Sequence, residues 1–127
     1  MSMFFIGRKK PRFASMSHFN QLPEFEKELK RLEKKYPSLS DDLKRFEGII
    51  ELNPVGIGTN FVTVHHSSNL KIVKARLACK SLRDRSMRII YAYHNDAVTF
   101  VYIEIYFKGD KENENRERIK NYLKSVL

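Results

Sequence analysis

The sequence is poor in cysteine, tryptophan, glycine and proline, with one, none, five and four among its 127 residues. The single cysteine, Cys79, excludes an internal disulfide framework and a metal site built from several thiolates, and it fits a reducing compartment. No stretch approaches the roughly 20 apolar residues of a membrane span, and the opening "MFFI" is too short for a signal-peptide core. We therefore expect a cytoplasmic protein without a membrane partner.

Acidic residues are scarce relative to basic ones. The sequence holds 24 Lys and Arg against 15 Asp and Glu, a formal charge of +9. Such an excess makes a polyanion, and nucleic acid in particular, the leading class of partner. Apolar residues make up 42% and charged residues 31%, an ordinary globular composition, so the length predicts a single domain. We place that domain at residues 16–127, after a flexible basic tail over residues 1–15.

Two amphipathic helices are predicted in the first half of the domain, after a short strand near residues 17–20. Residues 23–35 repeat apolar side chains at helical spacing, with a proline where a helix start tolerates one. A second apolar stripe covers residues 39–50, with Asp41 and Asp42 in its first turn, where the helix dipole favours acids. A short turn joins the two helices, so we expect an antiparallel hairpin.

Three strands should follow the loop at residues 54–69, which has extended sequence only around residues 61–64. They are predicted at about 70–79, 87–94 and 97–107, with "ND" as a tight turn between the last two. The tail "KENENRERIKNYLKSVL" predicts a closing helix. These elements indicate an α+β domain in which the helical hairpin packs on one face of a small antiparallel sheet, with a C-terminal helix.

Alternation along the strands predicts a basic face on this sheet. In the first strand Lys74 and Arg76 lie opposite the apolar row, and in the middle strand Arg88 does so. The last strand is expected to present an apolar row of Val101, Ile103, Ile105 and Phe107. Its other row is polar and aromatic and contains Tyr102, Glu104, Tyr106 and Lys108. The "KSLRDR" turn adds three cations at one end, Lys80, Arg83 and Arg85.

Like charges gathered on one face repel each other unless an anion or a carboxylate neutralises them. One interpretation is that Glu104 and Asp84 pair with two of the arginines while water solvates the other cations. The other, which we favour, is a phosphate-binding surface whose tyrosines stack on unpaired bases of single-stranded RNA. The predicted RNA-binding residues are Lys71, Lys74, Arg76, Lys80, Arg83, Arg85, Arg88 and Tyr102.

The histidines and the cysteine give weaker signals. His65 and His66 adjoin each other, but adjacent side chains point apart on an extended chain, so a metal site would need further ligands. We predict no metal and no other cofactor. An acid or base role for His65, His66 or His94 stays an alternative. Cys79 falls on the apolar face, where a small buried hydrophobe is expected rather than a nucleophile.

The order of elements resembles the RelE/ParE superfamily of toxins from toxin–antitoxin modules. The resemblance rests on "PEFEKELKRLEKKYPSL" as the first helix, "VKARL" and "MRIIY" as paired strands, and "IEIYFKGDKENEN" as the last strand and its exit. It covers roughly residues 17–125 and is closer to the RelE branch. It implies a cognate antitoxin protein as partner. For the RelE branch it also implies cleavage of messenger RNA in the ribosome, whereas the ParE branch acts on gyrase.

The resemblance also implies roles for particular residues. Basic residues of the RelE branch match Lys74, Arg76 and Arg88, and Lys108 matches a further basic residue after the last strand. Cleavage by a ribose 2′-hydroxyl needs cations around the developing phosphorane, a general acid and a general base, without a metal ion. RelE-type nucleases carry a Tyr or His near the C-terminus for proton transfer, whereas "GDKENENRERI" has neither. The predicted catalytic residues are therefore Arg76, Arg88 and Lys108, with Tyr106 and Glu104 as nearby substitutes.

Two other functions stay open on the sequence. One is a ParE-like toxin that acts by binding a protein, and the other is a non-catalytic interaction protein that keeps the fold. The favoured hypothesis is a metal-independent endoribonuclease that inhibits translation. The missing Tyr or His leaves open whether the chain is an enzyme.

Overall fold

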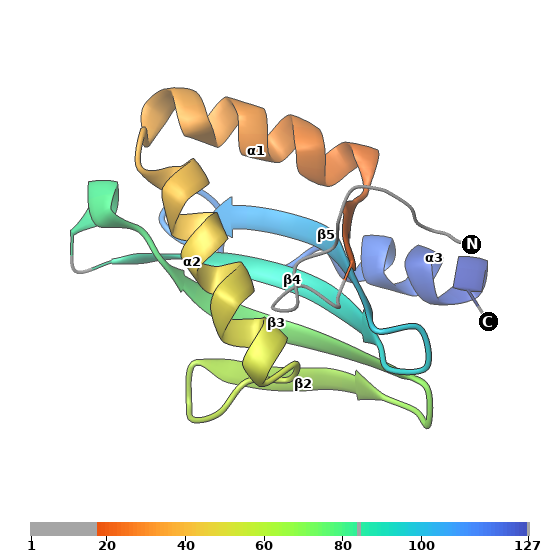
Figure 1. Cartoon of the computed structure of the whole chain (residues 1–127). Helices are drawn as coiled ribbons and strands as arrows, with labels where there is room; N and C mark the ends of the chain where they lie inside the picture. Colours follow the sequence, from red (N-terminus) through yellow and green to blue (C-terminus); the bar gives the residue numbers. More distant parts are fainter. Residues whose placement is uncertain (1–17, 84, 127) are drawn as a thin grey trace, which may run out of the picture.

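The computed structural model describes residues 18–83 and 85–126 (Figure 1). The predicted tail over residues 1–15 and the predicted ion-pair partner Asp84 lie outside the described residues. Within the described ranges the order of elements is β1 (His18–Gln21), α1 (Pro23–Lys35), α2 (Leu39–Leu52), β2 (Phe61–His66), β3 (Leu70–Ala78), β4 (Ser86–His94), β5 (Thr99–Phe107) and α3 (Arg116–Val126). A short 3-10 helix, Lys80–Leu82, lies between β3 and β4.

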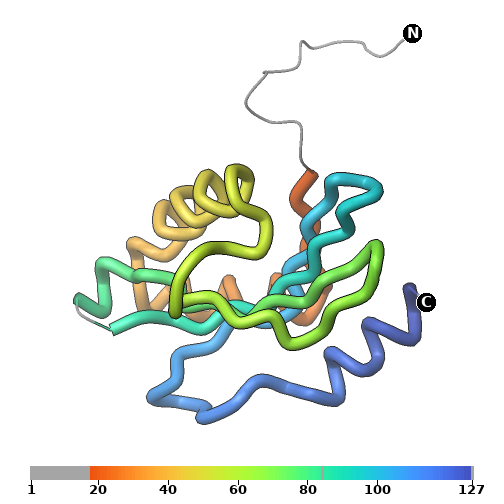
Figure 2. The backbone as a smooth tube through the Cα atoms, turned by 90° about the horizontal axis from the view of Figure 1, so that it is seen from below, coloured from red at the N-terminus to blue at the C-terminus, as the bar shows by residue number. Residues whose placement is uncertain are grey.

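The strands form one sheet in the order β1-β5-β4-β3-β2, with β1 parallel to β5 and every other pair antiparallel. The sheet lies between the α1–α2 hairpin on one face and α3 on the other (Figure 2). The predicted α+β class and the helical hairpin on one face are confirmed. The short strand before α1 and the three later strands form as expected, as β1, β3, β4 and β5. The segment expected to be mostly loop adds a fifth strand, β2.

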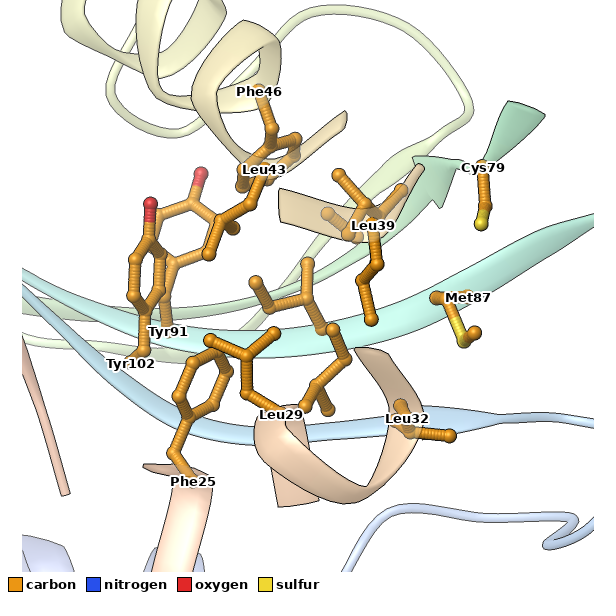
Figure 3. Close-up of a cluster of buried hydrophobic side chains, with 14 of the residues drawn as sticks. Phe25, Leu29, Leu32, Leu39, Leu43, Phe46, Cys79, Met87, Tyr91 and Tyr102 are labelled. Atoms are coloured by element: carbon orange, nitrogen blue, oxygen red, sulfur yellow. The ribbon is translucent and has the colours of Figure 1, made fainter. Parts of the chain in front are cut away.

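The helical hairpin forms because each helix buries one apolar stripe. In α1 the stripe is Phe25, Leu29 and Leu32, spaced at four and three residues so that all three side chains lie on one face. The stripe of α2 meets the same surface of the sheet (Figure 3). Burial of each such side chain stabilises the fold by about 1.5–3 kcal/mol. Pro23 at the first position of α1 and Asp41 in the first turn of α2 favour the observed starts.

A β-bulge in β5 changes which of its side chains face the hairpin. Ile90 of β4 lies opposite Glu104, but the next residue, Tyr91, lies opposite Tyr102, so Ile103 is the extra residue. Tyr102 packs in the core beneath the hairpin, while Ile103 packs beneath α3. The predicted rows are therefore correct from Glu104 to the end of the strand, but from Ile103 back to its start each residue lies on the face opposite to the predicted one. Simple alternation holds only as long as the strand has no extra residue.

The edge of β5 beyond β1 is sealed by an ion pair. The last residue that pairs with β1 is Tyr102. Past that point the N–H of Ile105 donates to Glu28 Oε1 at 3.2 Å, and the C=O of Ile103 accepts from Arg118 at 2.8 Å. Arg118 also donates to both carboxylate oxygens of Glu28, at 3.0 and 2.8 Å. The pair satisfies backbone groups that a further strand would otherwise pair, and it links α1 to α3.

We expect Arg118→Ala to lower the free energy of unfolding by about 2 kcal/mol, because the carbonyl of Ile103 and the carboxylate of Glu28 both lose a charged donor. Urea unfolding of the full chain measures this. The control is Arg116→Ala, whose side chain is 83% exposed against 16% for Arg118. That variant should stay within about 0.5 kcal/mol of the wild type. Equal effects of the two variants would contradict the sealing role.

Candidate nucleic-acid interface

Two arginines face each other on neighbouring strands, on the side of the sheet away from the hairpin. Arg76 of β3 lies directly opposite Arg88 of β4, and Tyr106 of β5 lies on the other side of Arg88. Arg88 donates to the hydroxyl of Ser86 at 3.0 Å. Like charges directly opposite each other on a sheet destabilise it. A bound anion would reverse the sign of that contribution.

The two arginines lie in a groove made of two adjoining hollows. The first, of about 310 Å³, also contains Lys74, Lys108 and Glu114. The second, of about 290 Å³, shares Arg76, Arg88 and Lys108 with it and adds residues of the β3–β4 turn and the end of β5. We call the two hollows the basic groove. Its charged lining consists of five cations and one carboxylate, namely Lys74, Arg76, Arg85, Arg88, Lys108 and Glu114.

The carboxylate in the groove pairs closely with Lys74, and Arg116 Nε lies 3.9 Å from its other oxygen. Lys74 Nζ lies 2.9 Å from Glu114 Oε1, and this hydrogen bond raises the pKa of Lys74 despite partial burial. Burial would raise the pKa of Glu114, but the hydrogen bond and charge of Lys74 outweigh it and the pKa is lowered. In the described ranges no carboxylate lies within ion-pair distance of Arg76 or Arg88. These two guanidinium groups are available to an external anion.

The turn between β3 and β4 is fixed by a buried carboxylate near the start of α2. Asp42 accepts from the hydroxyl of Ser38 at 2.7 Å and from the N–H of Lys80 at 3.1 Å. Ser81 donates its N–H to the hydroxyl of Ser38 at 2.9 Å. Cys79 is buried beside them, as predicted, and burial raises the pKa of its thiol. This cluster anchors the turn that brings Arg85 into the groove.

Arg85 joins the groove through an aromatic contact. Its guanidinium lies 5.0 Å from the centre of the Phe107 ring, a cation–π distance, and both residues line the second hollow. Lys80 and Arg83, which were predicted to bind RNA from the same turn, are exposed but do not line either hollow. The structure thus brings one of the three turn cations to the groove.

Two of the predicted RNA-binding residues lie on the wrong side of the sheet. Tyr102 is 0% exposed, stacks on Phe25 at 5.0 Å and donates its hydroxyl to Glu47 at 3.1 Å. It cannot stack on a base, because the bulge turns it toward the hairpin. Lys71 differs from Lys74 in strand parity and therefore lies on the opposite face.

The two predicted substitutes for the missing Tyr or His are both buried. Glu104 is fully buried, accepts the N–H of Asn115 at 2.7 Å and pairs with Lys111. It does not line the groove, and both its oxygens hold the segment that follows β5. Tyr106 is 4% exposed, and burial raises its pKa. Its hydroxyl has no hydrogen-bond partner among the described residues, and it does not line the groove.

The histidines lie away from the basic groove. His65 and His66 are in β2, and His94 ends β4, where its Nε2 lies 2.5 Å from the hydroxyl of Tyr122. None of the three lines either hollow. In the part of the chain that the structure describes, no group of three or more His, Cys, Asp or Glu could hold a metal ion. That part also has no helix with the length and apolar character needed to cross a membrane.

Sequence reasoning missed Glu114, the carboxylate of the groove. It stands in "KENEN", a run of charged and polar residues after the last strand, and no periodicity places such a residue over a particular strand. Glu104, whose buried carboxylate ties the run to the sheet, lies on the face that alternation predicts. Alternation does not reveal that its partners, Asn115 and Lys111, come from this run.

The arrangement of elements is similar to that of two solved RelE structures. One is the archaeal RelE–RelB complex from Pyrococcus horikoshii OT3, with 19% identity, a TM-score of 0.58, and coverage of 75% of this chain and 98% of that chain. The other is an E. coli toxin RelE carrying two arginine-to-alanine substitutions, in the free state. It has 16% identity, a TM-score of 0.52, and coverage of 87% of this chain and 97% of that chain.

Sequence comparisons add no relative. No protein-family model matches the chain, and no curated protein matches it either. The likeness is therefore one of structure, and it covers nearly the whole length of both RelE chains. The chain has the fold of the RelE toxins.

Proposed function

We propose that the chain is a RelE-like toxin that binds messenger RNA in the basic groove and cleaves it in the ribosome. The observation that carries this proposal is the pair Arg76 and Arg88, held face to face with Lys108 beside them and without a carboxylate partner among the described residues. Such a pair disfavours the empty state and favours a bound phosphate. The RelE-like fold supports the same class of function.

The chemistry that suits this groove is attack of a ribose 2′-hydroxyl on the adjacent phosphate. The phosphorane that forms carries more negative charge than the phosphodiester, so cations fixed around it lower the barrier. Arg76 and Arg88 each offer a planar fork of donors that matches two phosphate oxygens. Lys108 adds a point charge at the junction of the two hollows. Removal of one such donor typically slows catalysis about 10²–10³-fold.

The proposed partners follow from this role. A toxin that cleaves message in the ribosome acts in the cytoplasm and needs a cognate antitoxin to silence it in the host cell. One neighbour in structure is a RelE–RelB complex, and the net charge of +9 suits an acidic partner protein. A second candidate function is inhibition by protein binding, as a ParE-like toxin or a non-catalytic interaction protein. The burial of Tyr106 favours it, because that hydroxyl is withdrawn from proton transfer.

The double variant Arg76→Ala, Arg88→Ala should abolish cleavage of ribosome-bound message and relieve growth arrest on expression, because the phosphorane loses both guanidinium groups. Mapping of RNA ends in cells measures the cleavage. The matched control is Lys30→Ala, Arg31→Ala, which removes two exposed cations from α1 and should stay toxic. Unchanged toxicity of the groove variant would contradict the nuclease. Inhibition of gyrase in vitro with intact message would support the protein-binding candidate.

The same groove variant should lose part of the salt dependence of RNA binding. Each phosphate contact on a single strand contributes about −0.7 to the slope of log affinity against log salt. Loss of two contacts should therefore make the slope less steep by about 1.4. Titration of an uncleavable 2′-O-methyl RNA at several salt concentrations measures it. An unchanged slope would show that neither arginine contacts the RNA backbone.

A further inference from the structure

Glu114 is held at the basic groove by the hydrogen bonds of the residue that follows it. The residue that follows it, Asn115, donates its N–H to the buried carboxylate of Glu104 at 2.7 Å. The side chain of Asn115 accepts from the N–H of Arg118 at 3.0 Å and so caps the start of α3. With its neighbour fixed on both sides, Glu114 extends to Lys74, and its side chain is only 11% exposed.

Glu114 also differs in chemistry from the other charged groups of the groove. Arginine stays protonated at every physiological pH, and the pKa of Lys74 is raised above its ordinary value. The hydroxyl of Tyr106 is buried, and none of the four histidines lines the groove. Among the described residues that line the groove, Glu114 is thus the one titratable side chain that is deprotonated at neutral pH.

We propose that Glu114 is the general base of the RNA cleavage and that Lys74 is its proton partner. This inference rests on the proposed function, and it supplies the proton transfer that a Tyr or His near the C-terminus was expected to perform. A carboxylate at the entrance of a cationic groove is suited to the task, because it is ionised and lies beside the groups that would hold the phosphate.

Glu114 takes the proton of the ribose 2′-hydroxyl, and the 2′-oxygen forms a bond to phosphorus. The bond from phosphorus to the 5′-oxygen breaks, and that oxygen takes a proton from the ammonium of Lys74. The products are a 2′,3′-cyclic phosphate and a 5′-hydroxyl. Glu114 then passes its proton to Lys74 along their hydrogen bond of 2.9 Å, which restores the starting state.

The competing view is that Glu114 only occupies the place of a phosphate. In that case the carboxylate would repel RNA, and its removal would strengthen binding and speed cleavage. The base hypothesis gives the opposite result for cleavage. Both hypotheses permit tighter RNA binding once the charge of Glu114 is removed. The cleavage rate at saturating RNA therefore decides between them.

The experiment is single-turnover cleavage of ribosome-bound message by the full-length protein carrying Glu114→Gln. We expect a rate at least about 100-fold below wild type, a typical contribution of a general base. Affinity for an uncleavable 2′-O-methyl RNA should be equal or higher. Glu114→Asp, which keeps a carboxylate, should recover about ten-fold over the Gln variant. The control Glu112→Gln makes the same change of charge at an exposed position of the same segment and should cleave normally.

The results distinguish failure of the role of Glu114 from failure of the nuclease function. If wild type cleaves and Glu114→Gln cleaves as fast or faster, Glu114 is not the base, while the proposed nuclease stands. If the Asp variant is no faster than the Gln variant although both melt at the wild-type temperature, a proton-transfer role is likewise overturned. If wild type itself cuts no message, the proposed function fails and the inference falls with it.

Discussion

The extra residue Ile103 in β5 determines what each face of the sheet can do. It leaves Phe100, Tyr102, Ile105 and Phe107 on the side of the hairpin. It also leaves Ile103 and Glu104, which are consecutive, on the side of α3. If β5 alternated without a bulge, residues 102 and 104 would lie on the same face, so Tyr102 and Glu104 could not lie on opposite sides as they do. The core beneath the hairpin and the anchor beneath the C-terminal segment therefore depend on the same irregularity.

The buried carboxylate Glu104 explains why the groove has its shape. A fully buried carboxylate must be paired and hydrogen-bonded, and its partners are Lys111 and the backbone of Asn115. These contacts draw the segment after β5 back across the sheet and delay α3 until residue 116. Because α3 begins there, it covers the apolar end of β3 and β4, and leaves Arg76 and Arg88 open.

The sequence was sufficient for the three helices and for most of the strands, and for only part of the site. Helix 23–35, the hairpin and the closing helix could be predicted, because their apolar stripes repeat over several turns. Arg76 and Arg88 could be placed on one face, because β3 and β4 pair without a register shift. The face of Tyr102 could not be predicted, because residues 100–103 are all apolar or aromatic and alternation alone cannot reveal an extra residue among them. The position of Glu114 could not be predicted, because it depends on the contact between the neighbouring Asn115 and Glu104.

Parity also explains why the acceptor of protons would come from outside the strands. On this face, at this end of β3, β4 and β5, lie Lys74, Arg76 and Arg88, with Tyr106 buried beside Arg88. A carboxylate placed among them on a strand would pair with an arginine and cancel the attraction for phosphate. A carboxylate carried by the anchored segment instead meets Lys74 at one side of the groove. The two arginines are then left without a carboxylate partner among the described residues, and the proposed proton acceptor lies within the same hollow.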